Sequence, residues 1–341
     1  KTMDTKRYGP FLLSPMKIMG VSGAKDSRVQ GFKFTRTLDP LAPRTLKIRG
    51  FTMHYEEPVF RPPSEARSLI LQATIGCSHN RCAFCGMYRT KRFRVRGFAE
   101  LKEDILKARE RWPGTRRVFL ADGDALSIST ENLVAILDLL NESFTELSRV
   151  GVYVNAANAL SKPDEDLRLL SRKKLKTGYL GLESGNEEIL EEMHKGATAG
   201  QMVEAVRRCQ ENGIRMSVMV LLGLGGERRS RQHAEDTAKA LNRMNPRYLS
   251  FLSVIPVEGT PLFRRVQKGD FRELTPRQTL LEMRMILQAL RLEGTIFRSN
   301  HASNYLALSG RFPQDKERLI SEIENALSGQ GILRKEWERG L

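Results

Sequence analysis

Three cysteines lie close together in the chain, with the spacing Cys77-x4-Cys82-x2-Cys85. They directly follow residues 69–75, an apolar run rich in β-forming residues. Thiolates are the usual ligands of iron–sulfur clusters, and three on one short loop suit three irons of a [4Fe–4S] cube. The fourth iron would keep an open position at which a small molecule can bind and react. The pattern therefore predicts a reactive cluster rather than one that only carries electrons.

Zinc is the main alternative for this cysteine group. A structural zinc site normally has four protein ligands, so His79 or the distant Cys209 would have to complete it. Cys209 shares one helical face with Met202, Val203 and Val206, which favours a small core residue over a ligand. Four cysteines with three clustered do not indicate a disulfide framework, so we expect a reducing compartment, the cytoplasm.

The elements that must position these residues alternate between short apolar runs and amphipathic helical periods. The predicted strands are residues 68–74, 117–121, 151–155, 177–182, 214–222 and 248–254, with a short additional run at 295–299. The predicted helices are residues 98–112, 131–147, 164–171, 200–212, 231–244, 276–292 and 315–327. Strands alternating with helices predict right-handed crossovers and a parallel sheet. The fold class is therefore α/β, a parallel (β/α)6 partial TIM barrel with its site in the loops after the strands.

The size and charge of the chain suggest its organisation. It has 341 residues, 40% hydrophobic and 28% charged, with a net charge of +16, and no apolar stretch long enough to span a bilayer. We expect a basic N-terminal extension (1–60), a barrel core (61–265) and a C-terminal helical segment (266–341) that completes the barrel mouth. Residues 1–50 hold eleven Lys and Arg against three Asp, half of the net charge. They form either an arm for nucleic acid or a membrane surface, or a solvated extension.

The cysteine segment resembles the cluster loop of radical S-adenosylmethionine (SAM) enzymes, with Phe84 directly before the last cysteine. Further segments resemble motifs of this family, in the same order and at the ends of predicted strands. They are 122–124 (Asp-Gly-Asp for Gly-Gly-Glu), 181–185 (Gly-Leu-Glu-Ser-Gly), 193–196 (Met-His-Lys-Gly for Met-x-Arg-Gly), 223–227 (Gly-Leu-Gly-Gly-Glu for Gly-x-Pro-Gly-Glu) and 255–261 (Ile-Pro-Val-Glu-Gly-Thr-Pro for Pro-x-x-Gly-Thr-Pro). The last is similar to the elongator, methylthiotransferase and oxygen-independent coproporphyrinogen oxidase branches. Each short motif alone is unspecific, and the resemblance rests on their shared order.

The resemblance implies that SAM binds the open iron through its amino and carboxylate groups. Reduction of the cluster would then yield a 5′-deoxyadenosyl radical that abstracts hydrogen from a substrate. A one-electron donor such as flavodoxin or ferredoxin is an implied partner. The implied SAM contacts are Asp122, Gly123 and Asp124 at the amino group, Ser184 or Lys195 at the carboxylate, Glu183 or Asn155 at the ribose, and Gly223, Val257 and Phe84 at the adenine.

The chain departs from the family pattern at two places. The commonest motif is Cys-x3-Cys-x2-Cys, whereas this loop has one more residue in its first gap. Asp124 is one methylene shorter than the family's glutamate, which alters its contact with the SAM ammonium. Two implied contacts also have structural interpretations, because Glu183 could cap a following helix and the glycines of 223–226 could serve a tight turn.

Two further groups bear on the substrate. Residues 89–96 hold five cations just past the cysteines, which indicates either a solvated face or a site for a carboxylate, a phosphate or a nucleic-acid backbone. His301 and Asn304 follow a short β-type run and are candidate substrate contacts, with a structural role as the alternative.

Three hypotheses for the function follow. The first is a radical SAM enzyme acting on a small or medium-sized anionic organic molecule, with a tetrapyrrole carboxylate as one candidate. The second is a tRNA-modifying relative that docks RNA through its basic arm, and the lack of a recognisable acetyltransferase or second oligonucleotide-binding pattern favours the first. The third is a zinc-bound module without enzymatic activity, which predicts a colourless protein.

Overall fold

Eight strands form one curved sheet in the order β1-β4-β5-β6-β7-β8-β9-β10. The computed structural model describes residues 53–331, 333–335 and 338, so the expected basic arm at 1–50 lies outside the described residues. Neighbouring strands are parallel except for β9 and β10, which are antiparallel. The bounds are β1 (Leu69–Gln72), β4 (Arg117–Ala121), β5 (Arg149–Tyr153), β6 (Leu175–Glu183), β7 (Arg215–Leu222), β8 (Tyr248–Ser253), β9 (Ile296–Arg298) and β10 (Ser309–Arg311).

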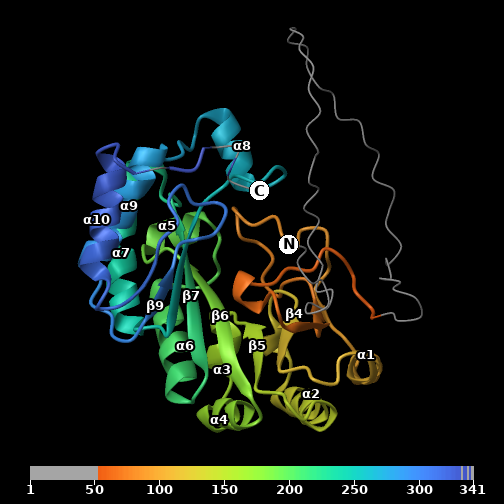
Figure 1. Cartoon of the computed structure of the whole chain (residues 1–341). Helices are drawn as coiled ribbons and strands as arrows, with labels where there is room; N and C mark the ends of the chain where they lie inside the picture. The colour runs from red at the N-terminus through yellow and green to blue at the C-terminus, as the bar shows by residue number, and fades with distance from the viewer. Residues whose placement is uncertain (1–52, 332, 336–337, 339–341) are drawn as a thin grey trace, which may run out of the picture.

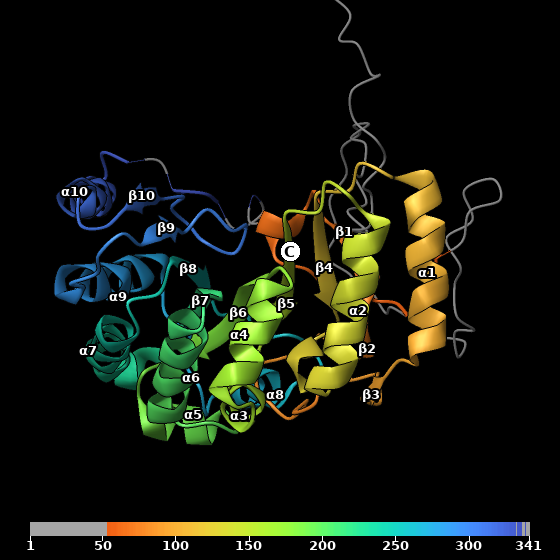
Figure 2. The ribbon, with the colours of Figure 1, turned by 90° about the horizontal axis from the view of Figure 1, so that it is seen from below.

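Helices cover the convex side of this sheet, as the two views of the ribbon show (Figure 1 and Figure 2). The sheet starts at β1 and ends at β10 without pairing between them, so the expected partial barrel is confirmed as an open one. No helix within the described part of the chain combines the length and apolarity that a membrane span requires. The helices are α1 (Phe98–Arg111), α2 (Thr130–Ser143), α3 (Ala156–Ser161), α4 (Asp164–Arg172), α5 (Glu187–Glu192), α6 (Ala199–Glu211), α7 (Gly226–Met244), α8 (Pro261–Lys268), α9 (Pro276–Ala289) and α10 (Lys316–Leu327).

The main core lies between the convex face of the sheet and these helices. Leu120, Val152, Val218 and Phe251 are at most 1% exposed and belong to one large apolar cluster with the inner faces of the helices. Along each strand such residues alternate with residues of the concave face, because successive side chains of a strand point to opposite sides. Burial on both faces explains why these strands read as nearly continuous apolar runs.

Aromatic residues fill the concave face beside the first strands. The ring of Phe119 meets those of Tyr153 and Tyr179 edge to face, with centroids 5.1 and 5.9 Å apart. Below them, the fully buried Glu65 of the short helix η2 (Pro63–Glu65) pairs with Arg149 and accepts a hydrogen bond from Tyr179. This packing fills the concave face near Arg149, the first residue of β5.

Several boundaries differ from the prediction. The first expected strand is divided, because β1 ends at Gln72 and a separate β2 (Thr74–Ile75) pairs with β3 (Arg94–Val95). The helix expected over 131–147 ends at Ser143, since Phe144 leaves the helical conformation and packs into the core.

The chain beyond residue 265 also contains more secondary structure than expected. The β-type run at 295–299 is confirmed as β9, and β10 extends the sheet further, so residues 266–341 are not only helical. The helix expected over 231–244 begins earlier, at Gly226, inside the glycine-rich segment. Helices α3, α5 and α8 were not predicted because six to eight residues are too few to show a helical period. The domain limits at 61–265 and 266–341 stay a prediction.

Candidate cofactor site

The three clustered cysteines lie in one loop at the carboxyl-terminal edge of the sheet. We call residues 76–93, between β2 and β3, the cysteine loop. Cys77, Cys82 and Cys85 are half-buried free thiols. Burial raises the pKa of Cys82 to about 11.

No three His, Cys, Asp or Glu side chains in the described part of the chain are placed to hold a single metal ion. A [4Fe–4S] cube does not need such a site, because each of its thiolates binds a different iron. The set of three thiols on one loop therefore fits a cube with one open iron. Cys209 lies apart from them, fully buried in the main core, which confirms its interpretation as a core residue.

Arg89 stabilises the cysteine loop through hydrogen bonds to carbonyl groups of the same loop. Its Nε donates to the carbonyl of Cys85 at 2.8 Å, and its Nη2 donates to that of Cys82 at 2.9 Å. A guanidinium can serve two carbonyls at once because its donors lie in a fixed planar fork. The backbone that carries two of the thiols is therefore held at a set spacing.

Two other cations of the basic run have buried partners. Lys91 is buried and pairs with Asp122 at 2.9 Å, and Arg96 pairs with the buried Asp104 at 2.8 Å. The interpretation of residues 89–96 as one continuous solvated face is thereby corrected, whereas the exposed Arg92 and Arg94 leave the anion-site interpretation a prediction. The two buried cations hold the cysteine loop and β3 to the rest of the protein.

The segment 122–124 packs directly on the cysteine loop. The backbone N–H of Gly76 donates to Asp122 Oδ2 at 2.9 Å, and the N–H of Gly123 donates to the Gly76 carbonyl at 3.0 Å. A side chain at Gly123 would come within 2.9 Å of Cys77 Cβ, so only glycine allows this approach. Burial raises the pKa of Asp122, while Lys91 opposes the shift.

Asp124 lies beside the first cysteine and is fully buried. Its Oδ2 accepts hydrogen bonds from Ser78 and Asn158, both at 2.5 Å, and its Oδ1 accepts the backbone N–H of Asn155 at 3.4 Å. Burial raises the pKa of Asp124, although these donors act against the shift. A carboxylate offers about four acceptor positions, so about one stays open for a further donor.

Glu183 and Lys195 form an ion pair of 3.1 Å at the end of β6. The carboxylate of Glu183 folds back over Gly181, where a side chain would overlap it. Burial lowers the pKa of Lys195, but the neighbouring carboxylate of Glu183 acts against burial, and the net shift of the pKa is upward. The ammonium of Lys195 is therefore held at the end of β6 by Glu183.

Glu183 does not cap the helix that follows it. Asn186 does so, because its side chain accepts the N–H of Ile189 at the start of α5. The capping interpretation of Glu183 is therefore wrong. Asn155, the other residue expected at the ribose, caps α3 by accepting the N–H of Ala157 at 3.0 Å.

A buried polar network, not foreseen from the sequence, joins the strand ends of β6 and β7 to α9. Glu282 of α9 is fully buried and accepts the N–H of Gly223 at 2.6 Å and the hydroxyl of Ser230 at 2.5 Å. His233 of α7 lies between Glu282 and Ser184, with 3.6 Å from Nε2 to the carboxylate and 2.8 Å from Nδ1 to the hydroxyl. Ser184 is itself fully buried, so its hydroxyl is engaged inside the protein.

The residues expected at the adenine surround the same loop. Phe84 packs against a small apolar cluster that contains Leu224 and Leu262. The side chain of Val257, which is 45% exposed, lies against Gly86, where a Cβ would come within 2.9 Å of it. The loops after β7 and β8 therefore both reach the cysteine loop.

The two candidate substrate contacts have different positions. Asn304 is fully buried: its amide donates to the Phe251 carbonyl at 2.7 Å and its oxygen accepts the Ser253 hydroxyl at 3.0 Å. The contacts of this side chain within the described residues are thus internal, and its role toward a substrate stays a prediction. His301 is half-buried, and its Nδ1 accepts the backbone N–H of Ser303 at 3.1 Å, which leaves Nε2 as its free nitrogen.

Comparison with known proteins gives three findings. A family model described as the radical SAM superfamily matches residues 71–241, half of the chain. The chain is 27% identical over 223 residues to an uncharacterized protein of Methanocaldococcus jannaschii, covering 60% of this chain and 66% of that protein. It is 22% identical over 178 residues to the heme chaperone HemW of Bacillus subtilis, covering 52% of this chain and 46% of HemW. The chain thus spans about two thirds of the length of the Methanocaldococcus jannaschii protein and under half of the length of HemW.

Solved structures share the fold. The cobalamin-dependent SAM radical enzyme OxsB aligns with a TM-score of 0.51 and 14% identity, covering 78% of this chain and 46% of OxsB. Methylornithine synthase (PylB) aligns with a TM-score of 0.47 and 15% identity, covering 80% of this chain and 85% of PylB. At this identity the likeness to OxsB concerns the fold alone.

Proposed function

Because this chain belongs to the radical SAM superfamily, whose members use a [4Fe–4S] cluster and SAM, we propose that it cleaves SAM reductively at a cluster on Cys77, Cys82 and Cys85. A cluster held by these three cysteines would supply the one electron that cleaves SAM to methionine and a 5′-deoxyadenosyl radical, and this radical would take a hydrogen atom from an unactivated carbon of an anionic substrate. A flavodoxin or ferredoxin would supply the electron. The cytoplasm, a reducing compartment, suits such a cluster.

The observation that carries this proposal is that the segments holding a cation, Lys195, and a carboxylate, Asp124, are both hydrogen-bonded to the cysteine loop. The carbonyl of His194, the residue before Lys195, accepts a hydrogen bond from His79, and Asp124 accepts one from Ser78, the neighbour of Cys77. A cation and a carboxylate placed this way suit the carboxylate and ammonium of an amino acid bound to the open iron. Lys195 is preferred to Ser184 for the carboxylate because the hydroxyl of Ser184 is engaged with His233.

The proposed contacts with the ribose and the adenine of SAM come from residues near the cysteine loop. Glu183 would bind the ribose hydroxyls once Lys195 turns toward the SAM carboxylate, with Asn155 as the second ribose contact. Phe84, Val257 and the backbone at Gly223 would enclose the adenine. We assign Asp122 no contact with SAM, because its carboxylate pairs with Lys91 and accepts the N–H of Gly76.

Anaerobic reconstitution with iron and sulfide, followed by SAM and dithionite, tests this proposal. We expect about four irons per chain and production of 5′-deoxyadenosine. Cys82→Ala should abolish cleavage, whereas the matched variant Cys209→Ala should leave iron content unchanged because Cys209 lies in the core. A colourless protein that retains zinc would refute the proposal, as would 5′-deoxyadenosine at the wild-type rate from Cys82→Ala.

An anionic substrate is supported by Arg298 on β9. It is aligned with Ser250 on β8, and both lie on the concave face, opposite the buried Leu249 and Phe297. Arg298 is exposed, and within the described part of the chain its guanidinium donates only to the Phe297 carbonyl and pairs with no carboxylate. A free guanidinium on the open side of a half-barrel suits a carboxylate. His301, with its free Nε2, follows on the same segment.

A carboxylated tetrapyrrole is one substrate to test, because the curated relative HemW is a heme chaperone. Arg298→Ala should lower the affinity for a carboxylated substrate about tenfold or more, and Arg298→Lys should restore part of it, since a charged hydrogen bond contributes about 1.5–3 kcal/mol. Equal affinities in all three proteins would exclude Arg298 from substrate binding. Iron content and SAM affinity serve as controls, since Arg298 lies outside the cysteine loop.

The alternative is an RNA-modifying enzyme that docks tRNA through residues 1–50, which hold half of the net charge. A salt-dependent gel shift with tRNA that is lost on deletion of residues 1–50 would favour this function. Unchanged RNA binding after the deletion would exclude the arm as the docking element.

A further inference from the structure

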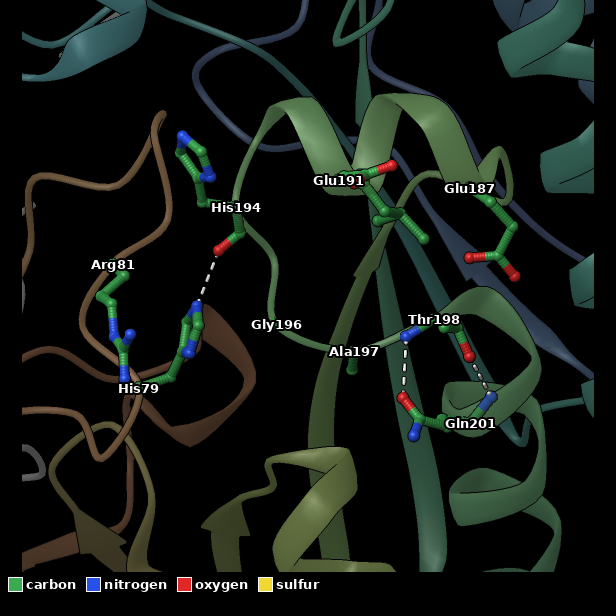
Figure 3. Close-up of a pocket in the computed structure, with 10 residues that line it drawn as sticks. His79, Arg81, Glu187, Glu191, His194, Gly196, Ala197, Thr198 and Gln201 are labelled. Atoms are coloured by element: carbon green, nitrogen blue, oxygen red, sulfur yellow. Dashed lines mark hydrogen bonds between the residues drawn. The ribbon is translucent and has the colours of Figure 1, made fainter.

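His79 occupies the lengthened gap between Cys77 and Cys82 and reaches out of the cysteine loop. Figure 3 shows its ring pointing at the segment that follows α5, where Nε2 lies 2.7 Å from the carbonyl oxygen of His194. A carbonyl can only accept, so Nε2 carries the hydrogen and donates it. The cysteine loop is therefore bonded to the segment that carries Lys195.

The same ring packs against Gly196, which requires a glycine. The backbone of Gly196 has φ +73°, in the left-handed region, and a Cβ there would lie within 2.6 Å of the Nδ1 atom of His79. His194 is also left-handed, with φ +51°. Two such residues around Lys195 make residues 193–196 a sharp turn, which we call the lysine turn, and His79 covers its outer side.

A second bond from the cysteine loop reaches the other end of the lysine turn. The N–H of Ala83 donates to the carbonyl of Met193 at 2.8 Å, and both side chains belong to the same buried apolar cluster. The successive carbonyls of Met193 and His194 are thus both held by the cysteine loop. The next residue is Lys195, whose ammonium lies 3.1 Å from Glu183.

We propose that His79 is a positioning residue that holds the lysine turn against the cysteine loop and so directs the Lys195 ammonium toward the SAM carboxylate. This inference rests on the proposed function for the identity of that ligand. It assigns a purpose to the additional residue in the Cys77–Cys82 gap, which lets the loop extend to the turn. In this proposal His79 acts through the position of Lys195 and not as a ligand of its own.

Three variants of His79 separate the bond from the packing. His79→Ala removes both, His79→Leu keeps most of the bulk without a donor, and His79→Gln keeps a donor near the position of Nε2. The matched control is His194→Asn, which removes the other imidazole at this place, keeps the carbonyl that His79 binds and tolerates the left-handed conformation.

The first readout is amide hydrogen exchange in the metal-free full-length protein. The amides of His194 and Lys195 donate to carbonyls of α5, so they report how firmly the lysine turn is held. We expect exchange to accelerate about tenfold in His79→Ala and His79→Leu, to stay near wild type in His79→Gln, and to stay unchanged in His194→Asn. Equal exchange in wild type and His79→Ala would overturn the proposal.

The second readout is made on the reconstituted protein. His79→Ala should retain its iron and bind SAM about tenfold more weakly, whereas His79→Gln should bind SAM nearly as tightly as wild type. Loss of about a quarter or more of the iron in His79→Ala would make His79 a metal ligand and refute its positioning role. If the wild-type protein assembles no cluster, the proposed function fails. The hydrogen exchange of the metal-free variants still tests the role of His79 in that case: accelerated exchange in His79→Ala supports it, and unchanged exchange contradicts it.

Discussion

Glu282 offers the sharpest test of how the strand ends are held, because its replacement has a cost that can be worked out from its contacts. This fully buried carboxylate accepts the N–H of Gly223 at 2.6 Å and the hydroxyl of Ser230 at 2.5 Å. Glu282→Ala leaves the buried Gly223 N–H without an acceptor, which costs about 1–3 kcal/mol, and loses a charged bond to Ser230 of about 1.5–3 kcal/mol. We expect a total loss of about 3–5 kcal/mol in the free energy of unfolding.

Glu282→Gln should be much milder. Its amide oxygen can still accept the Gly223 N–H, and its amide nitrogen can donate to the Ser230 hydroxyl, so both bonds persist as neutral ones. Neutral bonds contribute about 1 kcal/mol less than charged ones, so we expect a loss of about 1–2 kcal/mol. The difference between the two variants isolates the hydrogen bonds from the volume of the side chain.

Urea unfolding of the metal-free protein measures both losses, since the midpoint shifts while the slope stays constant. Gln288→Ala is the control, an exposed position on the same helix at which a change stays within about 0.5 kcal/mol. The reasoning is refuted if Glu282→Ala costs less than about 1 kcal/mol. If Glu282→Gln costs as much as Glu282→Ala, the charge rather than the acceptor is what this part of the fold requires.

Three further predictions follow from single contacts. Burial lowers the pKa of His233 below its usual 6.5, although the neighbouring carboxylate opposes this shift. The free energy of unfolding should therefore fall by up to about 1.4 kcal/mol per pH unit as the pH drops below 6.5 toward the folded-state pKa. His233→Gln should remove this pH dependence, as measured by urea unfolding between pH 5 and 8. Gly181→Ala should displace the Glu183 carboxylate and weaken SAM binding about tenfold or more by titration, and unchanged affinity would exclude that carboxylate from the site. Arg89→Lys should speed cluster loss to a chelator several-fold, since an ammonium cannot bridge two fixed carbonyls as a guanidinium does, whereas the exposed Arg92→Lys should behave as wild type.

The parallel sheet and the cysteine loop could be predicted because their signals are local in the sequence. A buried strand such as β7 needs only a continuous apolar run, and the cysteines need only their spacing. Elements shorter than the period that reveals them could not be predicted in this way. β10 consists of Ser-Gly-Arg, which has no apolar alternation, and it forms a strand only because β9 offers it an edge.

Side-chain partners were the least predictable part of the site. Glu282 lies 59 residues from Gly223 on an ordinary amphipathic helix, and nothing in its surroundings distinguishes it from a surface glutamate. Lys91 and Arg96 belong to a run of cations that normally indicates a solvated face, yet both are buried on carboxylates from other elements. Only Arg89 had a local signal, since it follows Cys85 by four residues, within reach of the carbonyls of its own loop.

The two departures from the family pattern, the longer first gap and the shorter acid, are in contact in the structure. Ser78, from the gap, donates to Asp124, which stands where the family has the longer acid. Its neighbour His79 donates to the lysine turn after β6, and Asn80 donates to the Tyr88 carbonyl within the cysteine loop. Three successive residues of the gap thus bond to three different segments. A gap shortened by one residue would have to give up at least one of these bonds, so the loop length, the aspartate and the histidine act as one unit in placing the charged groups around the thiols.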